Sequence, residues 1–447
     1  MNATALRKKY PRFFYRGYTY KHIGRDLHIS FDFVIPPDIS FAPKVVIKDV
    51  PKEHQDIKNL VFHLGLVEML SYWKATCSPE IVIEAGSLNK EQISWFKDLI
   101  IQGMGEYFFE NKINFTQHHF SKKIGAGFTK KNFLTITSSP STKLTLGQFA
   151  ALPRVSLRER TLVPVGGGKD AAVTLELLKK AGMPIRPFLL NPKPEQLRIL
   201  ALGKVGKPVV VQRTIDPRLL ELNRKGYLNG HTPFSAYLAF LSFLCAVIFN
   251  QKYIAPSNER SSNEGNVKYL GKMINHQYSK TYEFEKKFRA YAKKYLAKEI
   301  EYFSFLRPLY ELQIAKIFSR YPKYFSAFLS CNEANKTKSG RKKPTGKWCG
   351  KCSKCLFVFL ALYPFAGEKK TTAIFKKNLL KDKKLKPLLD ELTGKRKFKP
   401  FECVGTTKEC RIALALQTKS DHPLLHAWNS QHFLPQRFKA ILKESVK

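Results

Sequence analysis

The sequence predicts an α/β protein in which a doubly wound parallel sheet lies between an N-terminal α+β region and a helical C-terminal region. Strand and helix signals alternate from about residue 155 to residue 365, with strands expected near 161–165, 185–190, 208–214 and 252–256. This alternation is typical of parallel sheets that carry helices on both faces. The first of these strands also runs through three glycines straight into a helix, which is the kind of junction that such a sheet requires.

The pattern divides the chain into three expected regions: 1–150, an N-terminal α+β region; 151–365, the sheet domain with a cysteine cluster; and 366–447, a basic helical region. A chain of 447 residues has room for two or three domains and a sizeable core. Its hydrophobic fraction of 44% is normal for a globular protein. The N-terminus has no apolar segment of the kind found in secretory signals, so we expect a cytoplasmic protein.

The N-terminal region is expected to begin with a β-hairpin. Apolar residues alternate strictly with polar ones after a turn at residues 24–26, at Leu27, Ile29, Phe31 and Phe33. Helical patterns follow around residues 60–74 and 90–110, with a short strand at 81–83 between them. In the C-terminal region, Thr406 and Glu409 predict a capping box for a helix at 410–417. The N-terminal region shows no recognisable chemistry by itself.

The glycine triplet Gly166-Gly167-Gly168 is the strongest functional signal. It follows the strand at 161–165 and precedes Lys169-Asp170, the start of a helix that is expected to stop at Gly182. Three glycines let backbone N–H groups converge on one point, and the helix N-terminus adds partial positive charge. The junction therefore predicts a cradle for a phosphate or pyrophosphate, with an ordinary tight turn as the alternative.

The type of this loop can be narrowed by its spacing. A Walker loop needs Gly-x4-Gly-Lys-Ser/Thr, and a dinucleotide fingerprint needs Gly-x-Gly-x-x-Gly, and neither can be read here. Residues 165–171 instead resemble the Ser-Gly-Gly-x-Asp-Ser pyrophosphate loop of the ATP pyrophosphatases, whose sheet is of the adenine-nucleotide alpha-hydrolase type. Those enzymes cleave ATP between its α and β phosphates, usually to adenylate a substrate oxygen. Ala171 replaces the closing serine and removes a hydroxyl, so a weakened or idle site is an alternative.

Polar clusters follow several predicted elements of the sheet. Because ligands gather at the carboxyl ends of strands in open α/β sheets, these clusters are candidates for a binding site, although each alone reads as a capped loop. The loop at 257–266 is expected to be too polar to be buried without a ligand. The clusters are 228–233, 257–266, 275–280 with Glu283, and Arg307 with Glu311.

Four of the eight cysteines have the spacing of a metal site: Cys331, Cys349, Cys352 and Cys355. The run Cys-x2-Cys-x2-Cys can place three thiolates around one ion, and Cys331 could supply the fourth, as a closed structural zinc site prefers. A redox Cys-x-x-Cys, an iron–sulfur cluster and three free thiols are the alternatives. The other four give weaker signals, a redox pair for Cys403 and Cys410 and core positions for Cys77 and Cys245.

Net charge is the outlier of the composition, because 77 Lys+Arg against 35 Asp+Glu give a formal charge of +42. Such a charge suits polyanionic partners, with nucleic acid first among them. The basic residues are spread along the chain, however, so a solvated surface or a biased genome explains most of them. The most apolar stretch, 234–249, is short for a membrane span and is expected to be a buried helix.

Eight short motifs follow one another along the chain, at 10–13, 164–170, 228–231, 257–259, 275–280, 306–308, 348–352 and 400–405. In this order they resemble one enzyme family, the UDP-N-acetylmuramoyl-L-alanyl-L-glutamate epimerases of bacterial cell-wall synthesis. The resemblance runs from about residue 10 to residue 415. It implies use of ATP and Mg²⁺, a carboxyl adenylate, and inversion of the terminal L-glutamate of the nucleotide-linked muramoyl dipeptide to D-glutamate.

The resemblance implies roles for single residues. Proton transfer needs side chains whose pKa can lie near neutrality, and the candidates are His231, His276 and Lys280. Asp170 is also expected to hold magnesium. The substrate is expected at Asn229, Glu259 and Arg307. The ATP-binding residues are expected to be Gly166, Gly167, Gly168, Lys169, Asp170, Ala171, Ser257 and Asn258.

Two other functions compete with this interpretation. A tRNA- or nucleobase-modifying adenylating ATP pyrophosphatase would account for the charge of +42 and for the cysteines, which also resemble those of the 7-cyano-7-deazaguanine synthases. A non-catalytic binding protein would account for Ala171. Nucleic acid therefore ranks behind the muramoyl dipeptide as a partner, and no membrane span is expected.

Overall fold

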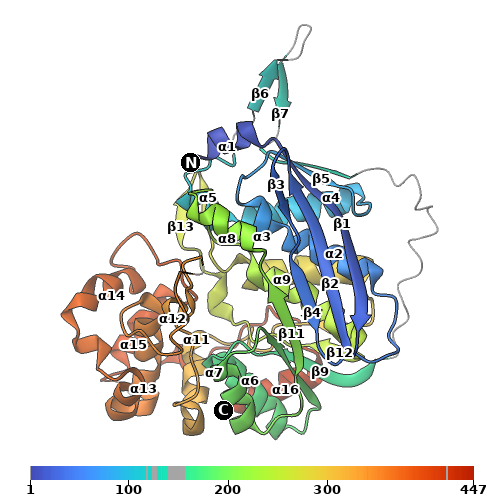
Figure 1. The fold of residues 1–447 in the computed structure, drawn as a ribbon. Coiled ribbons are helices and arrows are strands. Elements are labelled where there is room, and N and C mark those ends of the chain that lie inside the picture. Colours follow the sequence, from blue (N-terminus) through green and yellow to red (C-terminus); the bar gives the residue numbers. More distant parts are fainter. Residues whose placement is uncertain are drawn as a thin grey trace.

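The largest sheet has 11 strands, in the order β15-β12-β9-β10-β11-β4-β2-β1-β5-β8, with β3 paired to β2 (Figure 1). The computed structural model describes residues 2–116, 119–122, 128–131, 133–138, 157–339, 341–418 and 421–446. The N-terminal strands of this sheet are β1 (Arg12–Ile23), β2 (Asp26–Ile35), β3 (Ile39–Phe41), β4 (Lys44–Ile47), β5 (Glu80–Ile83) and β8 (Thr135–Ser138).

Strands β1 and β2 form the expected hairpin. They pair antiparallel, and Ile23 lies opposite Asp26, so the chain turns at residues 24–25. The turn needs a left-handed conformation at Gly24, whose φ is 60°. The alternating apolar side chains all lie in the core, which confirms the predicted period of two, at Leu27, Ile29, Phe31 and Phe33.

The second half of the sheet is parallel and has a switch in strand order. Each of its four neighbouring pairs is parallel. The spatial order of these strands is β15-β12-β9-β10-β11. The chain adds β10 and β11 on one side of β9, and then adds β12 and β15 on the other side. A crevice opens at such a switch point, outside the carboxyl ends of β9 and β12. The strands are β9 (Arg158–Pro164), β10 (Ile185–Leu190), β11 (Val209–Thr214), β12 (Gln251–Ile254) and β15 (Glu301–Tyr302).

Helices cover both faces of this half. Leu162 packs into the apolar cluster that contains α2 (Lys58–Glu68) and α9 (Phe234–Ile248). The next residue, Val163, packs into a different cluster on the other face of the sheet. That cluster contains residues of α6 (Lys169–Lys180), α7 (Pro194–Gly203) and α11 (Glu311–Ser319). Buried on both faces, the strands read as continuous apolar runs. The structure thus confirms an α/β protein with a mostly parallel central sheet.

The N-terminal strands join this sheet edge to edge. Strand β4 pairs antiparallel with β11, with Ile47 opposite Val211. One apolar cluster also runs from the hairpin to α9. The two regions therefore share a sheet and a core, and the predicted boundary at 150/151 lies outside the described residues.

The C-terminal part is helical, as predicted, and lies beside the sheet (Figure 1). Its main helices are α13 (Ser353–Phe375), α14 (Lys386–Leu392), α15 (Thr407–Ala415) and α16 (Gln436–Ser445). The capping box is present, because Thr406 Oγ1 accepts from Glu409 N at 3.1 Å and Thr406 N donates to Glu409 Oε2 at 2.8 Å. Helix α16 returns to the sheet, where Phe438 packs on Tyr253.

The remaining helices are α1 (Ala3–Lys9), α3 (Leu70–Trp73), α4 (Lys90–Gly103), α5 (Gly105–Glu110), α8 (Pro217–Arg224), α10 (Tyr282–Tyr295) and α12 (Asn332–Asn335). Two small sheets are formed by β6 (His119–Lys122) with β7 (Phe128–Lys131) and by β13 (Val267–Tyr269) with β14 (Lys272–Ile274). Helix α9 is almost fully buried, as expected from its composition. Within the described parts of the chain, no helix is both long and apolar enough to cross a membrane.

Candidate active site

A cavity of about 570 Å³ lies at the carboxyl ends of β9, β10 and β12, where the switch in strand order predicts a crevice. Several predicted ATP-binding residues line it: Gly166, Gly168, Asp170, Ala171, Ser257 and Asn258. A Cβ built on Gly166 would meet nothing within 4 Å, so the backbone is open to a ligand there. Gly167 has φ of 86°, and a Cβ on it would lie 2.7 Å from Glu195 Cγ, so this position requires glycine.

Lys169 does not face this cavity. Its side chain is only 2% exposed and forms ion pairs with Asp170 and Glu311. Burial would lower the pKa of Lys169, but the two carboxylates raise it above its ordinary value. The lysine therefore fixes the start of α6 against the start of α11, while Asp170 remains at the cavity wall. Burial and the Glu311 carboxylate raise the pKa of Asp170.

Arg307 is completely buried and is held by protein acceptors. Its guanidinium pairs with Glu285 at 3.1 Å and donates to the carbonyl oxygens of Glu259 and Lys280. It also donates to Ser262 Oγ at 3.1 Å. Because its side chain is 0% exposed, Arg307, predicted to bind substrate, instead connects the two loops that carry Glu259 and Lys280.

The polar loop at 257–266 has hydrogen-bond partners within the protein. Glu259, Ser261 and Ser262 are buried. Arg307 donates to the carbonyl oxygen of Glu259 and to Ser262 Oγ, and Ser261 Oγ accepts from Glu311 N at 3.0 Å. A buried arginine and a backbone amide thus stabilise this loop.

Lys280, the third proton-transfer candidate, lines the cavity together with Cys403. Its Nζ donates to Cys403 Sγ at 3.2 Å. Lys354, from the first turn of α13, donates to the carbonyl oxygen of Cys403 and lies 3.9 Å from Glu311. Buried Lys354 and half-buried Lys280 therefore converge on one cysteine at the edge of the cavity.

His276 and His231 lie next to this group. The His276 ring hydrogen-bonds both Glu106 and Cys403. The His231 ring is 4.4 Å from that of His276 between centroids, and its Nδ1 is 3.8 Å from Glu106 Oε2. Glu106, His276 and Cys403 thus form a continuous chain of hydrogen bonds that ends at the cavity wall. Neither histidine lines the cavity itself.

The charges in this chain alternate. Burial would lower the pKa of His276, but the hydrogen bonds to Cys403 and Glu106 raise it to about 10. Burial would raise the pKa of the Cys403 thiol, but the Lys280 ammonium and the hydrogen bond from His276 lower it to about 5. At neutral pH the pair is therefore an imidazolium and a thiolate. Burial and the cations His276, Lys74 and Lys280 lower the pKa of His231, so that ring stays neutral.

The two remaining substrate candidates differ in exposure. Asn229 is exposed, its Oδ1 accepts from Gly230 N at 2.9 Å, and it does not line the cavity. Glu259 is 4% exposed. Burial and the neighbouring Glu311 carboxylate raise the pKa of Glu259 to about 8, which makes it a candidate proton donor.

The structure thus brings the predicted glycine loop, Ser257, Asn258 and Lys280 to one cavity, with His276 and His231 behind its wall. Sequence reasoning missed Lys354, Glu106 and the position of Cys403. Cys403 lies in one of the motifs quoted above, at 400–405, but its spacing from Cys410 directed attention to a redox pair. Glu106 and Lys354 had no local signal, since each acquires its partner only through the fold.

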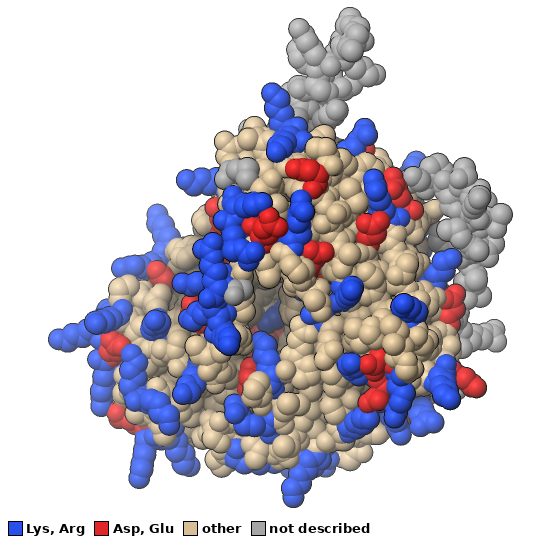
Figure 2. Space-filling model, in the orientation of Figure 1, with Lys and Arg blue, Asp and Glu red and all other residues tan. Residues whose placement is uncertain are grey.

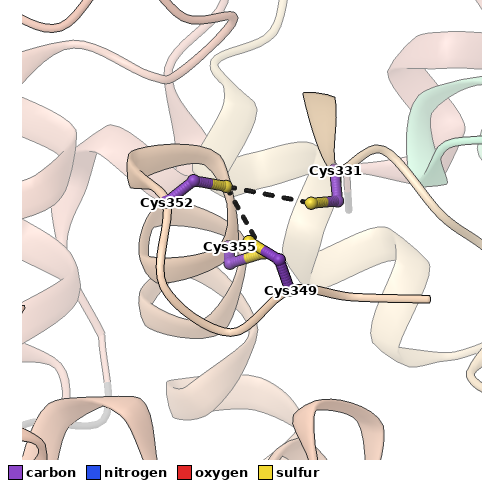
Figure 3. Close-up of side chains that lie close together, drawn as sticks. All are labelled: Cys331, Cys349, Cys352 and Cys355. Atoms are coloured by element: carbon purple, nitrogen blue, oxygen red, sulfur yellow. Dashed lines mark hydrogen bonds between the residues drawn. The ribbon is translucent and has the colours of Figure 1, made fainter. Parts of the chain in front are cut away.

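The four clustered cysteines converge from two segments, as Figure 3 shows. Cys331 precedes α12, Cys349 and Cys352 precede α13, and Cys355 lies in the first turn of α13. Sulfur–sulfur distances are 3.5 Å, 3.6 Å and 3.9 Å for the pairs Cys352–Cys355, Cys349–Cys355 and Cys331–Cys352. Thiolates at about 2.3 Å from a tetrahedral zinc would be about 3.8 Å apart. The donor set therefore fits the zinc that the spacing predicts, although an iron–sulfur cluster stays an alternative.

Basic side chains are spread over the visible face of the molecule, with a denser group beside a central hollow (Figure 2). A second hollow, of about 980 Å³, lies at the N-terminal strands and has Arg7, Lys8, Arg12 and Lys112 in its wall. It contains no residue of the glycine loop or of the cysteine cluster.

Comparison with known proteins gives consistent matches. Family models described as the MurL N-terminal domain and the MurL C-terminal domain match residues 4–305 and 327–445. The UDP-N-acetyl-alpha-D-muramoyl-L-alanyl-L-glutamate epimerase of Xanthomonas oryzae pv. oryzae is 34% identical over 79% of this chain and 73% of its own length. Proteins of the same name from Micromonospora sp. and Salinispora tropica are 39% and 40% identical, over 59% and 58% of this chain. Those two matches span 58% and 55% of the relatives' own lengths.

Proposed function

Since the chain belongs to the MurL family, we propose that it is an ATP-dependent epimerase that inverts the terminal glutamate of UDP-N-acetylmuramoyl-L-alanyl-L-glutamate. The observation that supports this most is the cavity at the switch point of the sheet. Gly166 and Gly168 of the glycine loop line this cavity together with Lys280 and Cys403. A nucleotide and the group to be activated could thus meet there.

The chemistry explains why such a reaction would need a nucleotide. The glutamate nitrogen is acylated by alanine, so it cannot form the imine through which pyridoxal enzymes acidify an α-proton. The α-carboxylate is anionic and opposes a carbanion beside it. ATP would supply an adenylyl group that removes this charge and turns the carboxylate into an activated acyl group. Proton removal, return of a proton to the other face and hydrolysis would then give the D-epimer.

The residues of the chain divide this work. The backbone of Gly166–Gly168 and the N-terminus of α6 would hold the phosphates, because both present N–H groups and partial positive charge. Asp170, at the cavity wall, would hold Mg²⁺, which prefers carboxylate oxygens. Thr174 Oγ1 lies 2.9 Å from Ser257 Oγ and fixes the second wall of the cavity relative to α6. The pyrophosphate-loop type of this sheet belongs to the same proposal.

The test is direct: incubate the protein with ATP, Mg²⁺ and the UDP-linked L-alanyl-L-glutamate, then determine the chirality of the released glutamate and assay AMP. We expect D-glutamate and AMP only when ATP is present. Asp170→Asn should abolish AMP formation, whereas Asp98→Asn should not, because Asp98 pairs with Lys287 outside the cavity. L-glutamate alone after complete reaction would contradict the proposal, and salt-sensitive binding of tRNA would favour the nucleic-acid alternative.

A further inference from the structure

We propose that Cys403 is a catalytic residue of the proposed epimerase and that its thiolate removes the α-proton of the activated glutamate. The inference rests on the proposed function. It concerns a side chain that was not among the predicted proton-transfer residues: Cys403 lies in the motif at 400–405 but was interpreted as a weak redox pair with Cys410.

The position of Cys403 supports this role. Cys403 lines the same cavity as Gly166, Asp170 and Lys280. An acyl group activated at the phosphates held by the glycine loop would therefore lie in the same space as the Cys403 sulfur. His276 and His231 do not line the cavity, so neither reaches the reacting carbon without a change of conformation.

The groups around the Cys403 sulfur also support this role. Lys280 Nζ lies 3.2 Å from Cys403 Sγ, and His276 hydrogen-bonds the same sulfur while Glu106 holds the other side of the ring. This carboxylate–imidazole–thiol order orients the imidazolium and stabilises a thiolate. A structural cysteine in an apolar environment would instead be a neutral thiol, as burial makes Cys245 and Cys410.

Protonation states are the third argument, because the other candidates carry protons at neutral pH. Burial would lower the pKa of Lys280, but Cys403 and Glu259 raise it above its ordinary value. The pKa of His276 is about 10. Both groups are therefore cations that could donate or stabilise charge but not accept a proton. The charged groups that face Cys403 are Lys280, His276, Lys354 and, with opposite sign, Glu402.

The step balances as a proton transfer. The Cα–H bond breaks, the proton forms an S–H bond with Cys403, and the electron pair remains on the substrate as an enolate of the activated acyl group. A proton that derives from solvent water returns to the opposite face of the α-carbon. Lys280 and His276 would stabilise the thiolate before the transfer, and Lys280, which lines the cavity, would stabilise the enolate oxygen after it.

Two experiments test this on the intact protein. In D₂O with ATP, Mg²⁺ and substrate, Cys403→Ser should lose deuterium incorporation at the glutamate α-carbon at least 100-fold while AMP formation persists. Cys410→Ala, which removes a buried thiol outside the cavity, should match the parent. Retention of parental deuterium uptake by Cys403→Ser would overturn the proposal. A hydroxylamine-sensitive acyl-enzyme, absent from Cys403→Ala, would also overturn it in favour of a nucleophilic role.

The second experiment does not require turnover, so it separates failure of this inference from failure of the proposed function. Iodoacetamide at pH 6 should modify Cys403 roughly fivefold to tenfold faster than an ordinary cysteine. The thiolate fraction of Cys403 is much larger at this pH, and this gain in rate outweighs the lower intrinsic nucleophilicity of a thiolate whose pKa is low. ATP with Mg²⁺ should slow this modification. Lys280→Gln should shift its pH dependence upward. Modification at the rate of an ordinary thiol would refute the inference even if the parent protein epimerises the substrate.

Discussion

Replacement of Arg307 by methionine should be among the most destabilising single changes in this protein. The guanidinium is 0% exposed and makes two hydrogen bonds to Glu285 Oε2, at 3.2 Å from Nε and 3.1 Å from Nη2. Removing one partner of a buried ion pair leaves the other charge uncompensated and typically costs about 3–5 kcal/mol. The carbonyl oxygens of Glu259 and Lys280 would lose their donor as well.

The measurement is urea unfolding followed by tryptophan fluorescence and circular dichroism, with coincident transitions required for a two-state treatment. Adding Glu285→Gln to Arg307→Met should recover part of the loss, because the neutral amide needs no counter-ion and can still accept from Ser304 N. The control is Arg320→Met, an exposed arginine that donates to Ser445 O, for which we expect about 1 kcal/mol. If Arg307→Met lowers the free energy of unfolding no more than this control does, the buried ion pair does not contribute as expected.

Three further outcomes are expected. Metal analysis should find about one zinc per chain, lost in Cys352→Ser but kept in Cys245→Ala, which lies outside the cluster; metal-free parent protein would contradict the site. Ala171→Ser should leave AMP formation equal or raise it, because Ala171 lines the cavity and the added hydroxyl could contact a phosphate; a loss of activity would show that the space is needed empty. The stability advantage of the parent over Cys403→Ser should be greatest between about pH 6.5 and pH 8.5.

The sign of this last prediction follows from the two pKa shifts. The folded pKa of Cys403 is lowered to about 5, so its contribution is present above the unfolded value and is lost as pH falls toward 5. The folded pKa of His276 is raised to about 10, so its contribution is present below the unfolded value and is lost as pH rises toward 10. Between the two unfolded values, folded and unfolded states bind the same number of protons at this pair, and the advantage is level. A steady slope through this window would contradict the imidazolium–thiolate pair.

Local patterns made much of the fold predictable. The alternation of apolar residues from Leu27 to Phe33 indicates a strand with one buried face. The apolar strand, the glycines at 166–168 and the start of α6 indicate a β–α junction. Both patterns depend only on residues that are neighbours in the sequence. The pairing of β4 with β11 could not be predicted, because it joins residues far apart in the chain that each satisfy only generic strand rules.

The site divides in the same way. The glycine loop is recognisable from three consecutive glycines. The buried position of the Lys169 side chain is not, because it depends on an ion pair with Glu311, which lies far away in the sequence. Lys169 was predicted to bind ATP because it follows the glycine triplet at the start of the helix in a loop that resembles a pyrophosphate loop. Cys403 depends likewise on Lys280 and His276, which arrive from a different part of the chain. Chemistry that arises from a neighbour's charge is visible only after folding.

The joint between β4 and β11 also governs how the protein can be divided. If the chain is cut between the hairpin region and the glycine-loop region, β11 becomes an edge strand with unpaired N–H and C=O groups. Such an edge is a template for pairing with other molecules, and the fragment would tend to self-associate. During synthesis β4 must likewise wait for β11 to be made, so the nascent hairpin exposes an open edge throughout that time. Expression of either half alone should therefore give aggregates, and co-expression of the two halves should restore solubility.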